Sequence, residues 1–223
     1  MCIFYFTCFS HTFSLLYLLI SQKGLSSKNS TAQVRTAYLQ CLSHCFTSST
    51  AHLGADVVPV LLKTIEKGAS QATQAPAVTE ALAATCLLLK LWASEGTVSE
   101  TQLSSVLPLI IDAEKQLFVS EKFLTVASDE ALNNVMMLCE HLLVSHAEKL
   151  EGRSNPFHHA VIFCLTCGSP SVRAHCRSVA KKMVSSLGGT EIARALLREF
   201  THCVEALKIQ VYFLDFLLLC RQN

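Results

Sequence analysis

Hydrophobic residues recur at steps of three and four positions along most of the chain, from Gln33 onward. This is the period of an α-helix with one buried face, because a helical turn takes about 3.6 residues. No stretch of the sequence shows the sustained alternation of apolar and polar residues that marks a half-buried strand. The pattern therefore predicts an all-α protein.

Start and stop signals divide this pattern into nine or ten helices. We expect Asp56 to cap the second helix and Gly68 to end it, and Pro76 suits the first turn of the third. Thr190 is expected to cap the last helix but one. The predicted helices cover residues 34–45, 57–68, 76–94, 100–111, 114–123, 129–143, 157–167, 171–187, 191–206 and 209–220.

Two of these helices open with similar sequences, Val34-Arg35-Thr36-Ala37 and Val172-Arg173-Ala174-His175. The 138 residues between them would hold three or four units of about 40 residues, the period of helix-pair solenoids. We therefore favour a HEAT/armadillo-like α-solenoid of stacked antiparallel helix pairs over a helical bundle. This segment would cover residues 34–223 and be truncated at its C-terminal end.

Residues 1–20 differ from the rest of the chain, since fifteen of them are apolar. Their length suits a membrane-spanning helix. However, the polar segment from Ser10 to Ser14 interrupts the run, and neither a basic start nor a small-residue cleavage site is visible. We favour an alternative, non-homologous start over a signal or membrane segment, followed by a linker at 21–33.

Composition and charge exclude several classes of protein. Hydrophobic residues make up 51% of the chain and charged residues 16%, which excludes a disordered tail. The net charge of +1 provides no overall attraction to nucleic acid or anionic lipid. The eleven cysteines are odd in number and lie in apolar stretches rather than between turns, unlike those of a disulfide scaffold. We expect a reduced, cytoplasmic protein.

Candidate chemical sites are few. Cys164 and Cys167, with histidines nearby, invite a zinc site, but a structural site usually draws four ligands from two short loops. No second such pair follows, so we favour core packing here and for Cys41 and Cys45. Phosphate-binding loops, nucleophile elbows and paired carboxylates are absent from the sequence. We expect no enzymatic activity, catalytic residue, cofactor, metal or small-molecule substrate.

The main charged feature is a basic ridge formed by Arg173, Arg177, Lys181 and Lys182. The first three lie four residues apart and so follow one side of a helix, opposite an apolar stripe. Such a stripe is either a solvated face or a surface that contacts phosphates with salt-dependent affinity. Arg194 and Arg198 repeat the spacing on the next predicted helix.

Several collinear segments resemble the large HEAT-repeat translational activator of the general amino acid control pathway. The resemblance covers residues 34–189, which are 156 of the 223 residues. That family binds ribosomes and activates the kinase that phosphorylates the alpha subunit of translation initiation factor two. The segments that carry the resemblance are 34–41, 60–91 (with Thr64–Lys67 and Leu87–Leu91), 115–124 and 181–189.

The resemblance implies a cytoplasmic, non-enzymatic scaffold segment in translational stress control. Its partners would be the ribosome and proteins of that pathway, with the basic ridge as a ribosome or RNA contact. The matching part is N-terminal in the family, so the kinase-binding region is not expected in this chain. Two alternatives stay open, namely a HEAT-repeat adaptor without ribosome contact and a membrane-anchored helical protein that uses residues 1–20.

Overall fold

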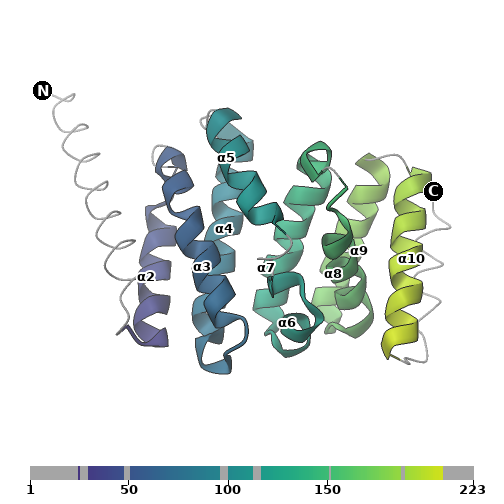
Figure 1. Cartoon of the computed structure of the whole chain (residues 1–223), viewed down its shortest axis with the longest axis horizontal. Helices are drawn as coiled ribbons and strands as arrows, with labels where there is room; N and C mark the ends of the chain where they lie inside the picture. The colour runs from purple at the N-terminus through teal and green to yellow at the C-terminus, as the bar shows by residue number, and fades with distance from the viewer. Residues whose placement is uncertain are drawn as a thin grey trace, which may run out of the picture. The chain divides into compact units, whose positions relative to one another are not determined.

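The computed structural model describes residues 25, 30–47, 51–95, 100–112, 117–150, 152–186 and 189–207 (Figure 1). All regular elements in these ranges are helices, so the predicted all-α class is confirmed. The chain divides into two compact units, residues 1–115 and 116–223. The boundary lies a few residues after the end of α5 (Glu100–Ile111).

The first unit is built from four described α-helices in two layers. α4 packs against both α2 and α3, and α5 packs against α3. In Figure 1, α4 lies behind α3 and α5. The described elements of this unit are α2 (Ala32–Cys45), η2 (Ala51–Asp56), α3 (Val58–Gly68), η3 (Ala72–Gln74), α4 (Ala75–Glu95) and α5 (Glu100–Ile111).

The second unit is also built from packed α-helices. α7 packs against α9, while α8 packs against α6 and α10, and α8 also contacts α7 and α9. Only Gly168 and Ser169 separate α8 from α9, so these two packed helices form an antiparallel hairpin. The described elements are η5 (Leu117–Val119), α6 (Glu121–Val126), α7 (Asp129–Glu140), η6 (His141–Ser145), η7 (Ala147–Leu150), α8 (Asn155–Cys167), α9 (Pro170–Ser186) and α10 (Gly189–Leu207).

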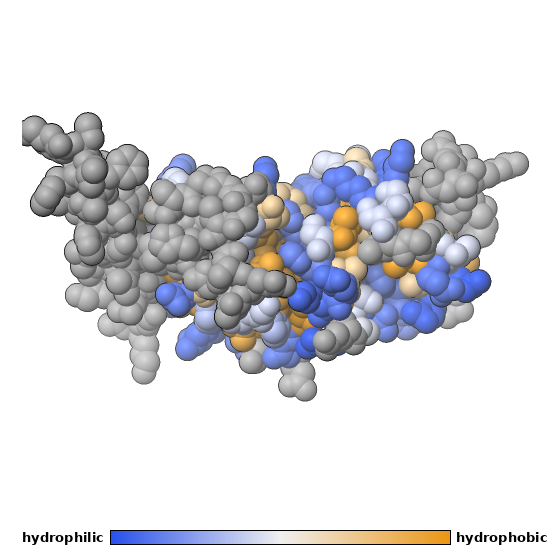
Figure 2. Space-filling model, turned by 90° about the horizontal axis from the view of Figure 1, so that it is seen from above, coloured by the Kyte–Doolittle hydropathy of each residue, from blue (hydrophilic) through white to orange (hydrophobic). Residues whose placement is uncertain are grey.

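Each unit buries an apolar core between its layers. Leu39 of α2, Leu61 of α3 and Leu82 of α4 are fully buried in the first unit. Phe118 and Phe157 fill the core of the second. In the view of Figure 2, hydrophilic residues cover most of the described surface of the second unit, with smaller apolar areas between them. Burial of one stripe per helix explains the three- and four-residue spacing in the sequence.

Three predicted helix starts were wrong. Asp56 lies in the 3₁₀ turn η2, and α3 begins after Val57 without a side-chain cap. Thr190 lies inside α10, which already begins at Gly189. Residues 114–123 do not form one helix, because the Ser120 hydroxyl accepts the Phe123 N–H and starts α6 there. This capping bond separates α6 from the preceding 3₁₀ turn.

The end of the predicted 129–143 helix also differs. α7 ends at Glu140, and the chain continues to Ser145 as a π-helical turn. Other expectations fall outside the described residues. These are the apolar segment at 1–20, most of the linker at 21–33 and the final helix at 209–220.

One described stretch, Ala72–Ala93, is long and apolar enough to cross a membrane by length and composition alone. Its most apolar window is 61% buried within the protein. The stretch includes nearly all of α4, which is covered by α2 and α3. Its apolar character therefore fits a core helix.

Candidate functional site

The basic ridge lies on α9, whose opposite side is anchored in the core. Pro170 opens this helix, and the Ser169 hydroxyl accepts a hydrogen bond from Val172 N at 3.4 Å. Val172, Cys176 and Met183 are fully buried. Because these residues fix the rotation of α9, the intervening basic positions are held on its outer sides.

The four residues of the ridge have different surroundings. Arg173 is half-buried, and its Nη1 donates to the carbonyl oxygen of Gly168 at 2.7 Å. Lys182 is exposed, and its Nζ forms an ion pair with Glu140 of α7 at 2.5 Å. Arg177 is half-buried and Lys181 is exposed. Arg173 and Lys182 therefore make local structural contacts, and the exposed Lys181 is well placed for an external partner.

The side of α9 that faces α7 carries polar contacts between the two helices. His175 Nδ1 lies 3.1 Å from Asn133 Oδ1, about two helical turns from the Lys182–Glu140 pair. Burial is the main cause that lowers the pKa of His175, and Lys182 adds to it, while Glu140 acts in the opposite direction. These contacts tie α9 to its neighbour and leave its other side to carry Arg177 and Lys181.

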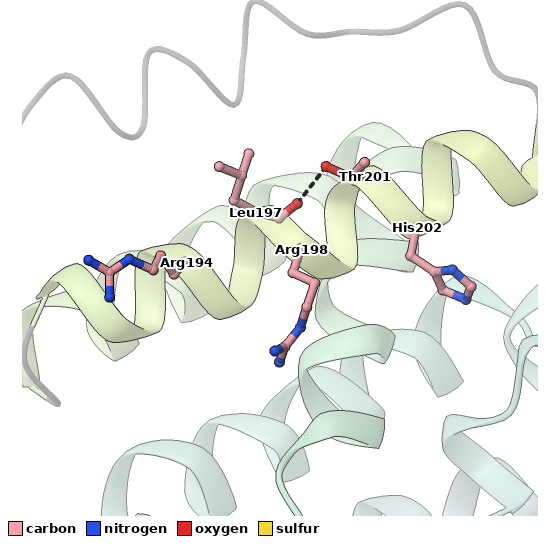
Figure 3. A pocket seen from close by; sticks show the side chains of 5 residues that line it. All are labelled: Arg194, Leu197, Arg198, Thr201 and His202. Atoms are coloured by element: carbon pink, nitrogen blue, oxygen red, sulfur yellow. Dashed lines mark hydrogen bonds between the residues drawn. The ribbon is translucent and has the colours of Figure 1, made fainter.

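A second basic face lies on α10. Arg194 pairs with Glu191, and Arg198 Nε lies 3.8 Å from Glu199 Oε1. Figure 3 shows a shallow, open depression lined by Arg194, Leu197, Arg198, Thr201 and His202. The Thr201 hydroxyl donates to the carbonyl oxygen of Leu197 at 3.0 Å. All five residues come from one helix, so this is a helix face and not an enclosed ligand site.

A cluster of ionisable side chains joins α6, α8 and α10. His159 of α8 lies 3.2 Å from Glu121 Oε1 through its Nε2 and 3.6 Å from Glu199 Oε2 through its Nδ1. Its Nδ1 also lies 3.7 Å from the Cys203 sulfur. A thiol, an imidazole and carboxylates in this order are the groups of a cysteine-nucleophile site.

The protonation of Cys203 argues against such a role. This residue is 1% exposed. Burial, followed by the negative charges of Glu121 and Glu199, raises the pKa of the Cys203 thiol to about 12. The thiol is therefore protonated near neutral pH, whereas a catalytic cysteine needs an accessible thiolate. The arrangement instead provides polar contacts that hold three helices together.

The residues considered for zinc do not converge on one point. Cys164 is buried, and a hydrogen bond with Cys176 followed by burial raises the pKa of its thiol. Cys167 is exposed at the end of α8, and His159 contacts the carboxylates of Glu121 and Glu199. Within the described ranges, no group of three or more possible ligands is close enough to share a metal ion. On α2, Cys45 is buried and Cys41 exposed.

The polar contacts between neighbouring helices were missed by the sequence reasoning. The His159 cluster and the His175–Asn133 contact join residues more than 30 positions apart. No local motif reveals such pairs. A search for polar residues that recur about 40 positions apart would have provided the only signal.

The chain is similar to part of a much larger protein. Over 189 residues, 84% of this chain, it is 40% identical to the stalled ribosome sensor GCN1 of Homo sapiens and 38% identical to the Mus musculus protein of the same name. It spans about 7% of the length of each relative. No family model matches the chain, and no solved structure matches it. The chain is thus homologous to a GCN1-like segment.

Proposed function

We propose that this chain is a HEAT-like α-solenoid segment that acts as a non-enzymatic, cytoplasmic scaffold in translational stress control. The observation that carries the proposal is the 40% identity over 189 residues to a protein named as a sensor of stalled ribosomes. Such a scaffold acts through its surface, by holding partners in place. The ribosome and proteins of the stress pathway are the partners that we propose.

Contacts between stacked helices support the solenoid architecture. In the first unit, α3 packs against α4 and α5, and in the second unit α8 packs against α9 and α10. The side chains that bond across these stacks are 39 to 44 residues apart, close to the repeat length of helix-pair solenoids. The pairs are Arg35–Gln74, Gln40–Glu80, Asn133–His175, Glu140–Lys182 and His159–Cys203.

Ribosome contact is proposed for the outer side of α9. The basic ridge of Arg173, Arg177, Lys181 and Lys182 provides cationic groups in a row, as binding to RNA phosphates requires. Arg177 and Lys181, four residues apart on α9, are the pair whose replacement tests this contact.

Ribosome co-sedimentation of the full chain tests this function. The test variant is Arg177→Glu with Lys181→Glu. The matched control is Lys63→Glu with Lys67→Glu, two exposed lysines of α3 with the same four-residue spacing. We expect the wild type and the control to pellet with ribosomes at low salt and the test variant to be lost from the pellet. The slope of log affinity against log salt should fall by about 2 in the test variant, one for each phosphate contact removed.

A protein-binding adaptor without ribosome contact is the second candidate. The nearly balanced charge of the chain and the neutralisation of Lys182 by Glu140 favour it. In that case no folded variant, wild type included, would pellet with ribosomes at low salt. If the test variant and the α3 control lost pelleting with ribosomes to the same extent, the overall charge of the chain, and not the basic ridge, would cause the pelleting.

A further inference from the structure

Both ring nitrogens of His159 on α8 face carboxylates, and the two carboxylates come from different helices. Nε2 lies 3.2 Å from Glu121 Oε1 of α6, and Nδ1 lies 3.6 Å from Glu199 Oε2 of α10. A neutral imidazole carries a proton on one nitrogen, whereas the charged imidazolium carries one on each. The charged ring therefore turns an N–H toward both carboxylates, while the neutral ring serves one of them.

The contact between His159 and α10 is shielded from water. The side chains of His159 and Glu199 are 16% and 14% exposed, whereas that of Glu121 is 50% exposed. Leu196 and Phe200 of α10, on either side of Glu199 in the sequence, are both buried. Charges that are partly buried are screened much less by salt than exposed charges. We therefore expect a charge on the ring to act mainly on the packing of α10.

Three more groups of α10 lie near this contact. Cys203 Sγ is 3.7 Å from His159 Nδ1, the His202 ring centroid is 6.2 Å from that of His159, and Arg198 Nε is 3.8 Å from Glu199 Oε1. Burial is the main cause that raises the pKa of the Cys203 thiol to about 12, so this group stays uncharged near neutral pH. The other charged or titratable groups on α8 and on the elements packed against it are His158, Cys164 and Cys167 of α8, Lys122 of α6, Asp129, Glu130, Cys139 and Glu140 of α7, and the ridge residues, His175 and Cys176 of α9, while η5 has none. Among the contacts made by the described residues, the two carboxylates thus provide the negative charge beside the ring.

We propose that His159 is a proton-dependent clamp, which joins α6 and α10 to α8 more firmly when its ring is charged. The charged ring lies between the carboxylates of Glu121 and Glu199 and attracts both. Loss of the proton leaves these two negative charges on either side of a neutral ring. The clamp holds the buried side of α10 in place and so fixes the opposite side, with Arg194 and Leu197, toward the outside (Figure 3).

The direction of the pH dependence follows from these two contacts. The carboxylate of Glu199 lies beside the ring only while α10 is packed on α8, so a proton on His159 favours the packed form. This contribution is present while the ring is protonated and is lost as the pH rises through the range in which histidines titrate, about pH 5 to 8. His158 acts in the opposite direction, because burial is the main cause that lowers its pKa below the ordinary value of 6.5.

Hydrogen exchange of the α10 amides in the full chain tests the clamp. Their protection, corrected for the intrinsic exchange rate, is measured in the wild type and in His159→Gln at about pH 6 and about pH 8. Both proteins keep His158 and the other histidines, so the ratio of their protection reports on His159 alone. We expect the ratio of wild type to variant to be about threefold to fivefold larger at the lower pH, as for a typical ion pair.

Two glutamate variants of α10 provide the matched comparison. Glu199→Gln removes the carboxylate that faces the ring, and its ratio to the wild type should show the same pH dependence as that of His159→Gln. Glu191→Gln removes an exposed carboxylate that pairs with Arg194, and its ratio should not change with pH. A ratio for folded His159→Gln that is equal at the two pH values, or larger at the higher one, would overturn the proposal. If His159→Gln does not fold, the glutamate variants decide, and equal ratios for both of them at each pH would overturn it as well.

Discussion

Single residues of the second unit differ widely in how much they support the fold. Phe157 is fully buried at the start of α8, and Phe118 is almost as deeply buried. Val126, at the end of α6, is 73% exposed although it is also hydrophobic. Residue type alone therefore does not decide which side chain matters, because the energy comes from the area removed from water.

Replacement of Phe157 by alanine should destabilise the protein strongly. The change removes a buried ring and leaves a cavity, at a cost of about 3 to 5 kcal/mol in the free energy of unfolding. Val126→Ala serves as the control and should change this free energy by less than about 0.5 kcal/mol. Urea unfolding followed by circular dichroism measures both values. Similar small effects of the two substitutions would contradict the burial described for α8.

At the scale of elements, the turn between α8 and α9 is tightly built. Gly168 is buried, and its N–H donates to the carbonyl oxygen of Cys164 at 2.9 Å. A Cβ at this position would lie 2.4 Å from that same oxygen and 2.9 Å from Val172 Cγ1. The oxygen belongs to the helix backbone and cannot move aside like the end of a flexible side chain.

Gly168→Ala should therefore push α8 and α9 apart at their connection. We expect a loss of about 1 to 3 kcal/mol in the free energy of unfolding, as is typical when an atom is added to a packed site. Ser178→Ala, on the exposed side of α9, is the control and should stay within about 0.5 kcal/mol of the wild type. Thermal unfolding compares the two variants. A Gly168→Ala protein as stable as the control would show that the turn has room to adjust.

The elements themselves were largely predictable from the sequence. Periodicity placed α4, α5, α8 and α9 within about two residues, because each helix buries a stripe that its own sequence records. Helix starts were less predictable, as Asp56 and Thr190 show, since a capping residue must itself have an extended backbone and both residues lie inside helical elements. The π turn after Glu140 left no signal in the sequence.

The candidate site was predictable only in part. The spacing of Arg173, Arg177 and Lys181 placed them on one helix, and the structure has them on α9. The spacing could not show that Arg173 binds the carbonyl oxygen of Gly168 or that Lys182 forms an ion pair with Glu140. Such contacts depend on which helices become neighbours in space, and a local pattern holds no record of that choice.

For the whole molecule, hydrogen bonds between elements in each unit join side chains about 40 residues apart. A solenoid repeat, as we propose for this chain, buries its apolar stripe against its neighbours and leaves long rows of outward-facing side chains. The similarity covers about 7% of the relatives' length, so any contact made here would be one of many along such a protein. Short basic segments such as Arg177 with Lys181 suit that role, because weak contacts add up along a scaffold.

Site-specific photocrosslinking to the ribosome tests the central claim most directly. A photoreactive benzophenone amino acid replaces Lys181 in the full chain, and a second protein carries it in place of the exposed Lys63 of α3. We expect light-dependent crosslinks to ribosomal RNA or protein from the first position and few or none from the second. Crosslinks of equal yield from both positions, or none from position 181 in ribosome-bound protein, would contradict ribosome contact through α9.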